Sequence, residues 1–286
     1  MTRSIINTKQ KFWKNTLSFI FCYLFTSTFA NAHDASSTYL ANASILVTNG
    51  KTKVLFDPFF HKNFGQYQLV PEQTLKAVFA GLPPFDGIDA IIISHAHGDH
   101  FAADDVVRYL MRYPATKLIA PQQAINQVNA LPEAKKIAKQ LYPIELKFQQ
   151  PPSSMTVDSL FVEGVRIPHA GWPQRADVEN IVFRVTLKDT DKAPITVMHM
   201  GDADPDDDHY LPFKEHWQQQ QTDTAFPPYW FFFSSEGNYI LDELINAKQH
   251  TGVHVPTVVP DKLKATGKDY FSVSGDTREI KVSTIE

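Results

Sequence analysis

The feature that most constrains this chain is the segment SHAHGDHF (residues 94–101), which directly follows the apolar run AIII (residues 90–93). A short apolar run of this kind predicts a strand buried on both faces. Side chains leaving a strand alternate between its two sides, so two histidines spaced by one residue can point the same way. The glycine after them lets the backbone turn the next side chains toward a neighbouring point. One loop thus offers four metal ligands, namely His95, His97, Asp99 and His100.

Other polar residues repeat this placement at the ends of predicted strands. In layered α/β proteins, the loops that follow strands converge at one edge, where active sites gather. Imidazole nitrogen and carboxylate oxygen are suitable ligands for Zn²⁺, Mn²⁺ or Fe²⁺. The histidine-rich loop can serve two adjacent ions, and three later residues would complete their coordination. The further strand-end residues are Asp57, His169, Asp202 and His254.

Some residues of similar chemistry fall outside this pattern. His250 is an alternative to His254, although a predicted helix ends near it, whereas His254 falls inside the next predicted strand. The acidic run DPDDD (residues 204–208) could bind a cation, but a solvated loop is the simpler interpretation. Isolated histidines are usually surface or packed residues, and we interpret His33, His61, His209 and His216 in this way.

The order of the predicted elements indicates a layered fold. Two apolar runs flank the turn signal Asn49-Gly50 and predict a hairpin over residues 43–58. Helical spacing is clear in residues 102–113. The second half predicts strands over 156–168, 180–187, 195–200, 229–234 and 251–255, a helix over 237–249, and a closing strand pair over 270–282. We therefore expect two similar halves that form sheets covered by helices in one domain.

The first 32 residues have the order of a secretory signal. Four basic residues and no acidic one precede the apolar stretch 16–30, which ends in the small-residue pattern Ala30-Asn31-Ala32. This stretch is short for a membrane span, and a short membrane anchor is the alternative interpretation. We expect cleavage after Ala32, one mature domain over residues 33–286, and a periplasmic or secreted protein with no stable membrane anchor.

Charge and cysteine content narrow the classes of partner and ligand. Cleavage would remove four bases and change the formal charge from −4 to −8. Such an acidic chain lacks the basic face that a phosphate backbone requires, so no nucleic-acid partner is expected. The single cysteine, Cys22, would leave with the signal. The mature protein would then hold a metal through nitrogen and oxygen alone.

Five motifs, in order, resemble those of the metallo-β-lactamase superfamily of metal-dependent hydrolases. They are the aspartate of LFDP, the H-x-H-x-D-H segment, an isolated histidine, the aspartate of MGDAD and a late histidine, and they extend over roughly residues 38–258. The resemblance implies an α+β (α/β) fold, the four-layer αββα sandwich, with metals at one edge of the two sheets. It implies one metal held by His95, His97 and His169, and a second held by Asp99, His100 and His254.

The resemblance also implies how the remaining site residues act. Asp202 would bridge both metals, and Asp57 would orient the histidine loop. Two divalent ions, Zn²⁺ first, with Mn²⁺ or Fe²⁺ as alternatives, would lower the pKa of a shared water and polarise the bond to be cleaved. A bridging hydroxide would then cleave an ester, lactone, amide or phosphodiester in a small molecule. Asp99 would take part in proton transfer.

The chain looks closest to the branch that contains lactonase-like and N-acyl-phosphatidylethanolamine phospholipase D-like proteins. Members of that branch often carry Gly-His where this chain has Ala41-Asn42, so a histidine that can act in the site is absent here. Aromatic residues near the predicted metal edge could bind an apolar or ring-shaped substrate, and the alternative is that they pack in the core and the loops. They are Phe59, Phe60, Trp172, Tyr229 and Trp230, and the first of these loops also carries Phe64 and Tyr67. A metal-dependent binding protein without catalysis is the alternative function, and a nuclease is a weaker one.

Overall fold

The computed structural model describes residue 1 and residues 35–190 and 193–282, so all but one residue of the predicted signal lie outside it. In the described part, seven strands form a first sheet in the order β13-β1-β2-β3-β4-β5-β6. Strand β3 lies antiparallel to β2 and parallel to β4, which confirms the predicted hairpin and places the AIII run in mid-sheet. These strands are β1 (Ser36–Ala41), β2 (Ser44–Thr48), β3 (Lys53–Phe56), β4 (Ala90–Ile92), β5 (Lys117–Pro121), β6 (Leu141–Ile144) and β13 (Thr277–Glu279).

Six strands form a second sheet in the order β12-β11-β10-β9-β8-β7. Strand β9 pairs antiparallel with both β8 and β10, so β8 and β10 run the same way and end at the same edge. These strands are β7 (Ser153–Val157), β8 (Leu160–Arg166), β9 (Ile181–Leu187), β10 (Ile195–His199), β11 (Thr222–Phe226) and β12 (Ala247–His250).

Apolar residues from both sheets meet in a central core. Val54, Phe56 and Ile92 of the first sheet belong to the same buried cluster as Phe183 and Val197 of the second. Strand β9 is buried along its whole length and is mostly apolar, and its one charged residue, Arg184, pairs with the buried Glu163. The sheets therefore pack face to face, and this burial fixes the strand ends that carry the polar loops.

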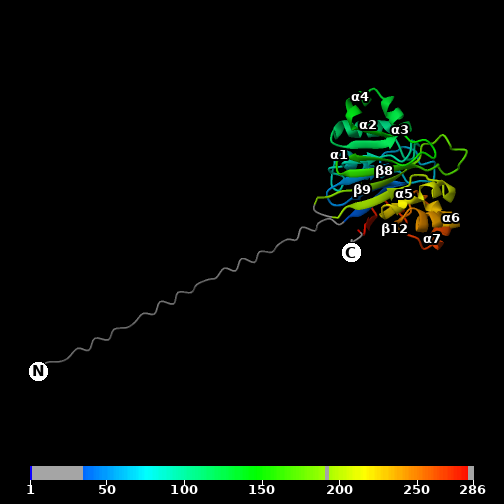
Figure 1. Cartoon of the computed structure of the whole chain (residues 1–286). Coiled ribbons are helices and arrows are strands. Elements are labelled where there is room, and N and C mark those ends of the chain that lie inside the picture. Colours follow the sequence, from blue (N-terminus) through cyan, green and yellow to red (C-terminus); the bar gives the residue numbers. More distant parts are fainter. Residues whose placement is uncertain (2–34, 191–192, 283–286) are drawn as a thin grey trace. The chain divides into compact units, whose positions relative to one another are not determined.

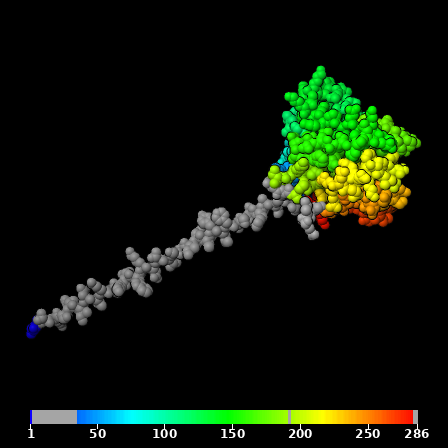
Figure 2. All heavy atoms as spheres, in the orientation of Figure 1, coloured from blue at the N-terminus to red at the C-terminus, as the bar shows by residue number. Residues whose placement is uncertain are grey.

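Helices cover the outer face of each sheet, as Figure 1 shows. The outer face of the first sheet packs against α1 (Glu72–Ala80), α2 (Ala103–Arg112), α3 (Gln122–Asn129), α4 (Ala134–Ile137) and the turn Ala138–Gln140. The second sheet is covered by α5 (Lys214–Gln218), α6 (Ser235–Tyr239), α7 (Asp261–Ala265) and the short turns Asp207–His209, Leu211–Phe213, Tyr229–Phe233 and Ile240–Leu244. The order helix, sheet, sheet, helix confirms the predicted αββα sandwich. In Figure 2 the residues of the two halves form one continuous surface.

Three expected elements of the second half are wrong. Residues 229–233 form a helical turn, because Pro227-Pro228 ends the strand and supplies the fixed φ of a helix start. The expected helix 237–249 ends at Leu244, since Asn246 adopts a left-handed conformation. The next strand is 247–250, which pairs with β11, and not 251–255. His250 therefore ends a strand, whereas His254 lies in the following turn.

The tail forms one short strand, β13, in the described residues, where a strand pair was expected. In the part of the chain that the structure covers, no helix is both long and apolar enough to cross a bilayer.

Candidate metal centre

The first group of donors comprises three histidines from two sheets. His95 and His97 follow β4, and His169 follows β8. Their ligand atoms lie within 4.8 Å of one another, and their ring centroids are 4.7–4.9 Å apart. His95 Nε2 faces His97 Nδ1 at 3.1 Å. His169 Nδ1 lies 2.7 Å from the carbonyl oxygen of Ala170, to which it can donate a proton, and this leaves Nε2 with its lone pair.

The second group comprises Asp99, His100, Asp202 and His254, all buried. Nε2 of His100 and Nε2 of His254 lie 3.0 and 3.2 Å from Oδ1 of Asp202. In the described part of the chain, none of these three buried atoms makes a hydrogen bond of acceptable geometry. Buried polar atoms are otherwise nearly always paired. Three such atoms converging on one point fit a divalent cation bound by nitrogen and oxygen.

Asp202 lies between the two groups. Its Oδ1 faces the pair formed by His100 and His254, whereas its Oδ2 lies 3.4 Å from His169 Nε2. One oxygen is therefore directed toward each group of donors. The structure thus brings together all seven residues that the sequence analysis selected as ligands, and it places His254, not His250, among them.

Asp57 and Ser94 support the histidine loop from below. Asp57 is buried, and its Oδ1 accepts a hydrogen bond from the backbone N–H of Ser94 at 2.7 Å. Its Oδ2 accepts from the Ser94 hydroxyl at 2.6 Å and lies 2.8 Å from His100 Nδ1. A proton on Nδ1 leaves His100 Nε2 free for the metal. Asp57 follows β3, beside β4 in the sheet, which explains why it reaches this loop.

The two groups of donors have opposite pKa shifts. Burial and the nearby charge of His100 hold the pKa of His95 well below its usual value, and burial also lowers that of His97. Burial would lower the pKa of His100 too, but the carboxylates of Asp202 and Asp57 outweigh it and raise that pKa well above its usual value. The pKa of His254 is raised because Asp202 and Asp99 likewise outweigh burial. The second group therefore binds protons more readily.

Both carboxylates of the second group are ionised at neutral pH. Burial disfavours the charge on Asp202, but His254 and His100 outweigh burial and hold its pKa well below its usual value. The same balance, with His254 first, lowers the pKa of Asp99. Each can therefore accept a proton or a cation without first losing a proton.

A tight turn delivers Asp202 from the end of β10. Gly201 has φ +55°, and a Cβ there would lie 2.4 Å from Asn180 Oδ1 and 2.7 Å from Ser94 Cβ. Asn180 Oδ1 accepts a hydrogen bond from the N–H of Asp202 at 3.0 Å. Asn180 was not predicted from the sequence as a site residue. The Gly-Asp pair after an apolar strand was the one signal of a tight turn that another residue supports.

Asn42 joins the two loops of the second group. It is buried and has φ +53°. Its Nδ2 donates to the carbonyl of Asp99, and its own carbonyl accepts from the N–H of His254, each at 2.8 Å. The position where the sequence departs from Gly-His thus holds a support for two ligands. In the sequence, the only signal of this supporting role was that Asn42 stands where the related branch often has a histidine.

His199 was also missed by sequence reasoning. It is buried at the end of β10, stacks on Phe56 with ring centroids 4.9 Å apart, and its Nε2 lies 2.8 Å from the carbonyl oxygen of Ala43. Burial lowers its pKa. It therefore joins the second sheet to the turn that contains Asn42. Because His199 lies three residues before Asp202 in the sequence, its position near the site could have been predicted.

A cavity of about 450 Å³ opens over the metal centre. The five aromatic residues selected from the sequence are not among the described residues that line it. Phe59 packs in the core against Phe79 and Tyr109, Phe60 is buried, and Trp172 packs on Phe148. Trp230 has its ring 5.3 Å from that of His254 and contacts Tyr229. The lining consists of Phe64, Gln66, Tyr67, His97, Asp99, Arg175, Asp177, Val178, Asp202 and His254.

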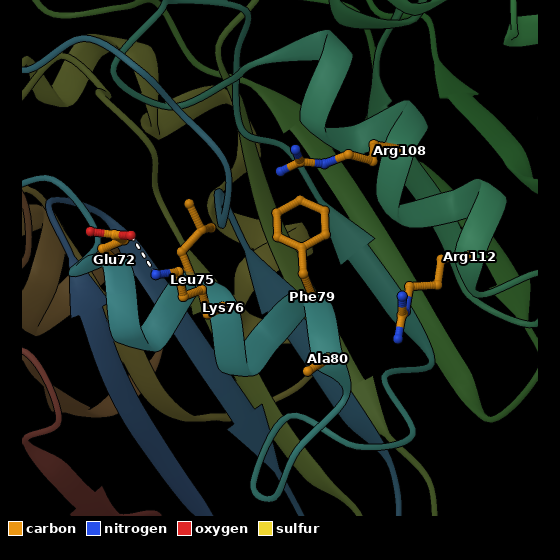
Figure 3. Close-up of a pocket in the computed structure, with 7 residues that line it drawn as sticks. All are labelled: Glu72, Leu75, Lys76, Phe79, Ala80, Arg108 and Arg112. Atoms are coloured by element: carbon orange, nitrogen blue, oxygen red, sulfur yellow. Dashed lines mark ion pairs between the residues drawn. The ribbon is translucent and has the colours of Figure 1, made fainter.

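A second hollow lies between α1 and α2 and shares no lining residue with the metal cavity. Figure 3 shows Arg108 over the ring of Phe79, and the guanidinium carbon lies 3.9 Å from the ring centroid. Arg108 pairs with Asp105 at 2.7 Å, and Lys76 pairs with Glu72. Arg112 lies at the end of this hollow and donates to the hydroxyl of Tyr113.

Comparison with known proteins agrees with this geometry. Residues 37–228 match the family described as the beta-lactamase superfamily domain, which is more than half of the chain. The chain belongs to this family. The curated relative "UPF0173 protein YddR" of Bacillus subtilis is 35% identical over 82 residues, which are 26% of this chain and 31% of the relative. The match thus spans about a third of that protein.

Two solved structures have a similar fold. Igni18, a metallo hydrolase from Ignicoccus hospitalis, is 15% identical with a TM-score of 0.55, and the match covers 87% of this chain and 99% of Igni18. The metallo-beta-lactamase fold protein YhfI from Bacillus subtilis is 16% identical with a TM-score of 0.54, and the match covers 86% of this chain and 99% of YhfI. The chain therefore has the metallo-β-lactamase fold, and the residues described above form a candidate site for divalent metal.

Proposed function

We propose that this protein is an exported hydrolase that uses two divalent metal ions, Zn²⁺ first, to cleave an ester, lactone, amide or phosphodiester bond in a small molecule. The observation that carries this proposal is the position of Asp202, whose two oxygens face two separate groups of donors. His95, His97 and His169 would hold one ion, Asp99, His100 and His254 the other, and Asp202 both. Mn²⁺ or Fe²⁺ would fit the same nitrogen and oxygen donors.

The residues of the chain have distinct tasks in this proposal. When bound, the two ions supply a water of lowered pKa and polarise the oxygen of the bond to be cleaved. Asp99 is ionised, lines the cavity and has Oδ2 3.3 Å from His254 Nε2, so it can hold a proton released during hydrolysis at that oxygen. Asp57 keeps the Nδ1 proton of His100 in place. The dimensions of the cavity fit a small molecule.

A substrate panel tests catalysis directly. Metal-reconstituted mature protein should hydrolyse at least one ester, lactone, amide or phosphodiester, a chelator should abolish the activity, and Zn²⁺ or Mn²⁺ should restore it. The matched control is His216→Ala, which removes a histidine that neither lines the cavity nor belongs to a candidate metal group of the described residues. No metal-dependent turnover across the panel, in a protein that does bind metal, would support the non-catalytic binding protein instead.

Export rests on the sequence of residues 1–32 and is tested separately. The full-length protein, made in a bacterium with a secretory pathway, should be recovered outside the cytoplasm with His33 as its N-terminus. Mass spectrometry of the intact protein measures this. A protein that keeps residues 1–32 and stays with the membrane would support the anchor, and recovery of the full chain in the cytoplasm would contradict export.

A further inference from the structure

The residues around the metal cavity carry an unusual distribution of charge. Arg175 is the only lysine or arginine among the described residues that line the cavity. Arg108, Arg184 and Arg278 each pair with a carboxylate elsewhere. By contrast, no carboxylate of the described residues lies within 4.0 Å of Arg175, and Asp177 of the same wall does not reach it. A cation without such a partner at the mouth of an active site is a candidate for binding an anion.

The local chain holds Arg175 over the first group of donors. Its Nη1 lies 3.5 Å from both ring nitrogens of His169. Gly171 has φ +92°, and a Cβ at this position would lie 3.6 Å from Cδ of Arg175, so the stem of the arginine packs against this turn. The guanidinium group therefore lies beside His169, a residue of the first group of donors.

Tyr67 also lines the cavity and contacts the second group of donors. Its ring meets that of His254 edge-on, with centroids 4.1 Å apart. Tyr67 and Arg175 line the same cavity, so a ligand in it can contact both side chains. The carbonyl of the preceding residue, Gln66, accepts a hydrogen bond of 2.8 Å from Thr257 and so holds the loop in place.

Arg175 offers a direct partner for an anion. A carboxylate or a phosphate would accept the two parallel hydrogen bonds that a guanidinium offers, whereas a neutral substrate supplies no charged partner. Asp99, Asp177 and Asp202 also line the cavity, so the case for an anion depends on the position of Arg175 and not on the total charge of the site.

We propose that the substrate carries an anionic oxygen group, a carboxylate or a phosphate, which is bound by Arg175 and by the hydroxyl of Tyr67 while the bond to be cleaved lies over the metal centre. Only the placement of the bond to be cleaved over the metal centre rests on the proposed hydrolase function. The anion site itself can be tested by equilibrium binding.

Binding of two probes to the Zn²⁺-loaded protein tests the anion site. Isothermal titration calorimetry would measure the Kd of inorganic phosphate and of succinate. Arg175→Ala should weaken binding of at least one of them about tenfold or more, as expected for a hydrogen bond between charged groups. Arg175→Lys should recover part of the loss, and Tyr67→Phe should show a smaller loss. Arg112→Ala removes an exposed arginine away from this cavity and should leave the Kd unchanged. The probe that depends on Arg175 identifies the anion as phosphate or carboxylate.

Hydrolysis of matched esters tests the same residue in turnover. For Arg175→Ala, KM should rise about tenfold more for mono-4-nitrophenyl succinate than for neutral 4-nitrophenyl acetate, with kcat changed much less and metal content unchanged. Equal effects on the two esters, together with an unchanged Kd for both probes, would overturn the anion site and leave the hydrolase intact. Binding that depends on Arg175 without any turnover would support the anion site and count against the hydrolase.

Discussion

At the scale of single residues, Asp57 shows how a group outside the ligand set can decide whether the set works. Its carboxylate holds the backbone and hydroxyl of Ser94 and the Nδ1 of His100. Without this acceptor, the imidazole of His100 could carry its proton on Nε2, the nitrogen that faces Asp202. Supports of this kind raise metal affinity because they fix the tautomer and the orientation of a ligand.

We therefore expect Asp57→Asn to weaken metal binding by roughly 10- to 100-fold, the usual effect of losing such a partner. Competition with a chromophoric chelator would measure the change. Asp89→Asn is the matched control, because Asp89 also accepts a backbone N–H, from Lys53 at 2.7 Å, but at the other end of β3. Equal metal affinity in the two variants would contradict the role given to Asp57.

The pKa shifts of the ligands predict the order in which metal is lost on acidification. His100 and His254 have raised pKa values, so protons compete for the second group from a higher pH downward. His95 and His97 have lowered pKa values and stay neutral at lower pH. Metal should therefore leave the second group first as the pH falls.

Variants that keep one group each would measure this order. After dialysis at a series of pH values, elemental analysis should show half-loss of metal at a higher pH in His97→Ala, which relies on the second group, than in His254→Ala, which relies on the first. The reverse order would contradict the prediction that the pKa values of the free histidines set the pH at which each group loses its metal.

At the scale of elements, the turn after β10 is the most constrained support of the site. Gly201 combines a positive φ with a lack of space for a Cβ. Gly87 also has a positive φ, +63°, but no atom lies within 4 Å of a Cβ built there. A comparison of alanine variants at Gly87 and Gly201 therefore separates two effects on stability. Both variants place a Cβ on a left-handed backbone, but only the one at Gly201 also brings that Cβ against other atoms.

Gly87→Ala should lower the free energy of unfolding by about 1–2 kcal/mol, the usual cost of a left-handed conformation for a residue with a Cβ. Gly201→Ala should cost clearly more, because Asn180 or Ser94 must also move. Urea denaturation of the metal-free proteins would measure both. If Gly201→Ala were the milder change, the turn would be less rigid than its contacts indicate.

At the scale of the whole molecule, the ligands come from both sheets, so a bound metal would link them. His95, His97, Asp99 and His100 follow the first sheet, whereas His169, Asp202 and His254 follow strands of the second. An ion that binds only the folded state stabilises it in proportion to its concentration and affinity.

Removing metal should therefore lower the Tm, and the free energy of unfolding should fall by about 2.7 kcal/mol relative to metal at 100 times its Kd. Differential scanning calorimetry with a chelator and after addition of Zn²⁺ would measure the shift. His216→Ala changes a histidine outside the candidate metal groups and should show the same shift as the unchanged protein. Identical Tm values with and without metal would contradict a site that spans the two sheets.

Sequence alone indicated the fold family and the candidate ligands, because most of the signals are local. A buried strand followed by closely spaced histidines needs no long-range information, and His169 and Asp202 also follow largely apolar strands. The strand predicted over 229–234 was wrong because Pro227-Pro228 starts a helical turn there. The helix predicted over 237–249 ends early because residues 247–250 pair with β11, and this pairing overrides local periodicity.

Only the tertiary structure decided which residues surround the ligands. His254 was separated from His250 by the pairing of β12, and the supports Asn42, Asn180 and His199 act through contacts between segments far apart in the chain. Arg175 and Tyr67 lie more than a hundred residues apart in sequence, yet both line one cavity. Spacing within a strand can show that a loop binds metal, but what faces the metal across a cavity depends on how two sheets pack. The packing of those two apolar faces therefore set the shape and charge of the site.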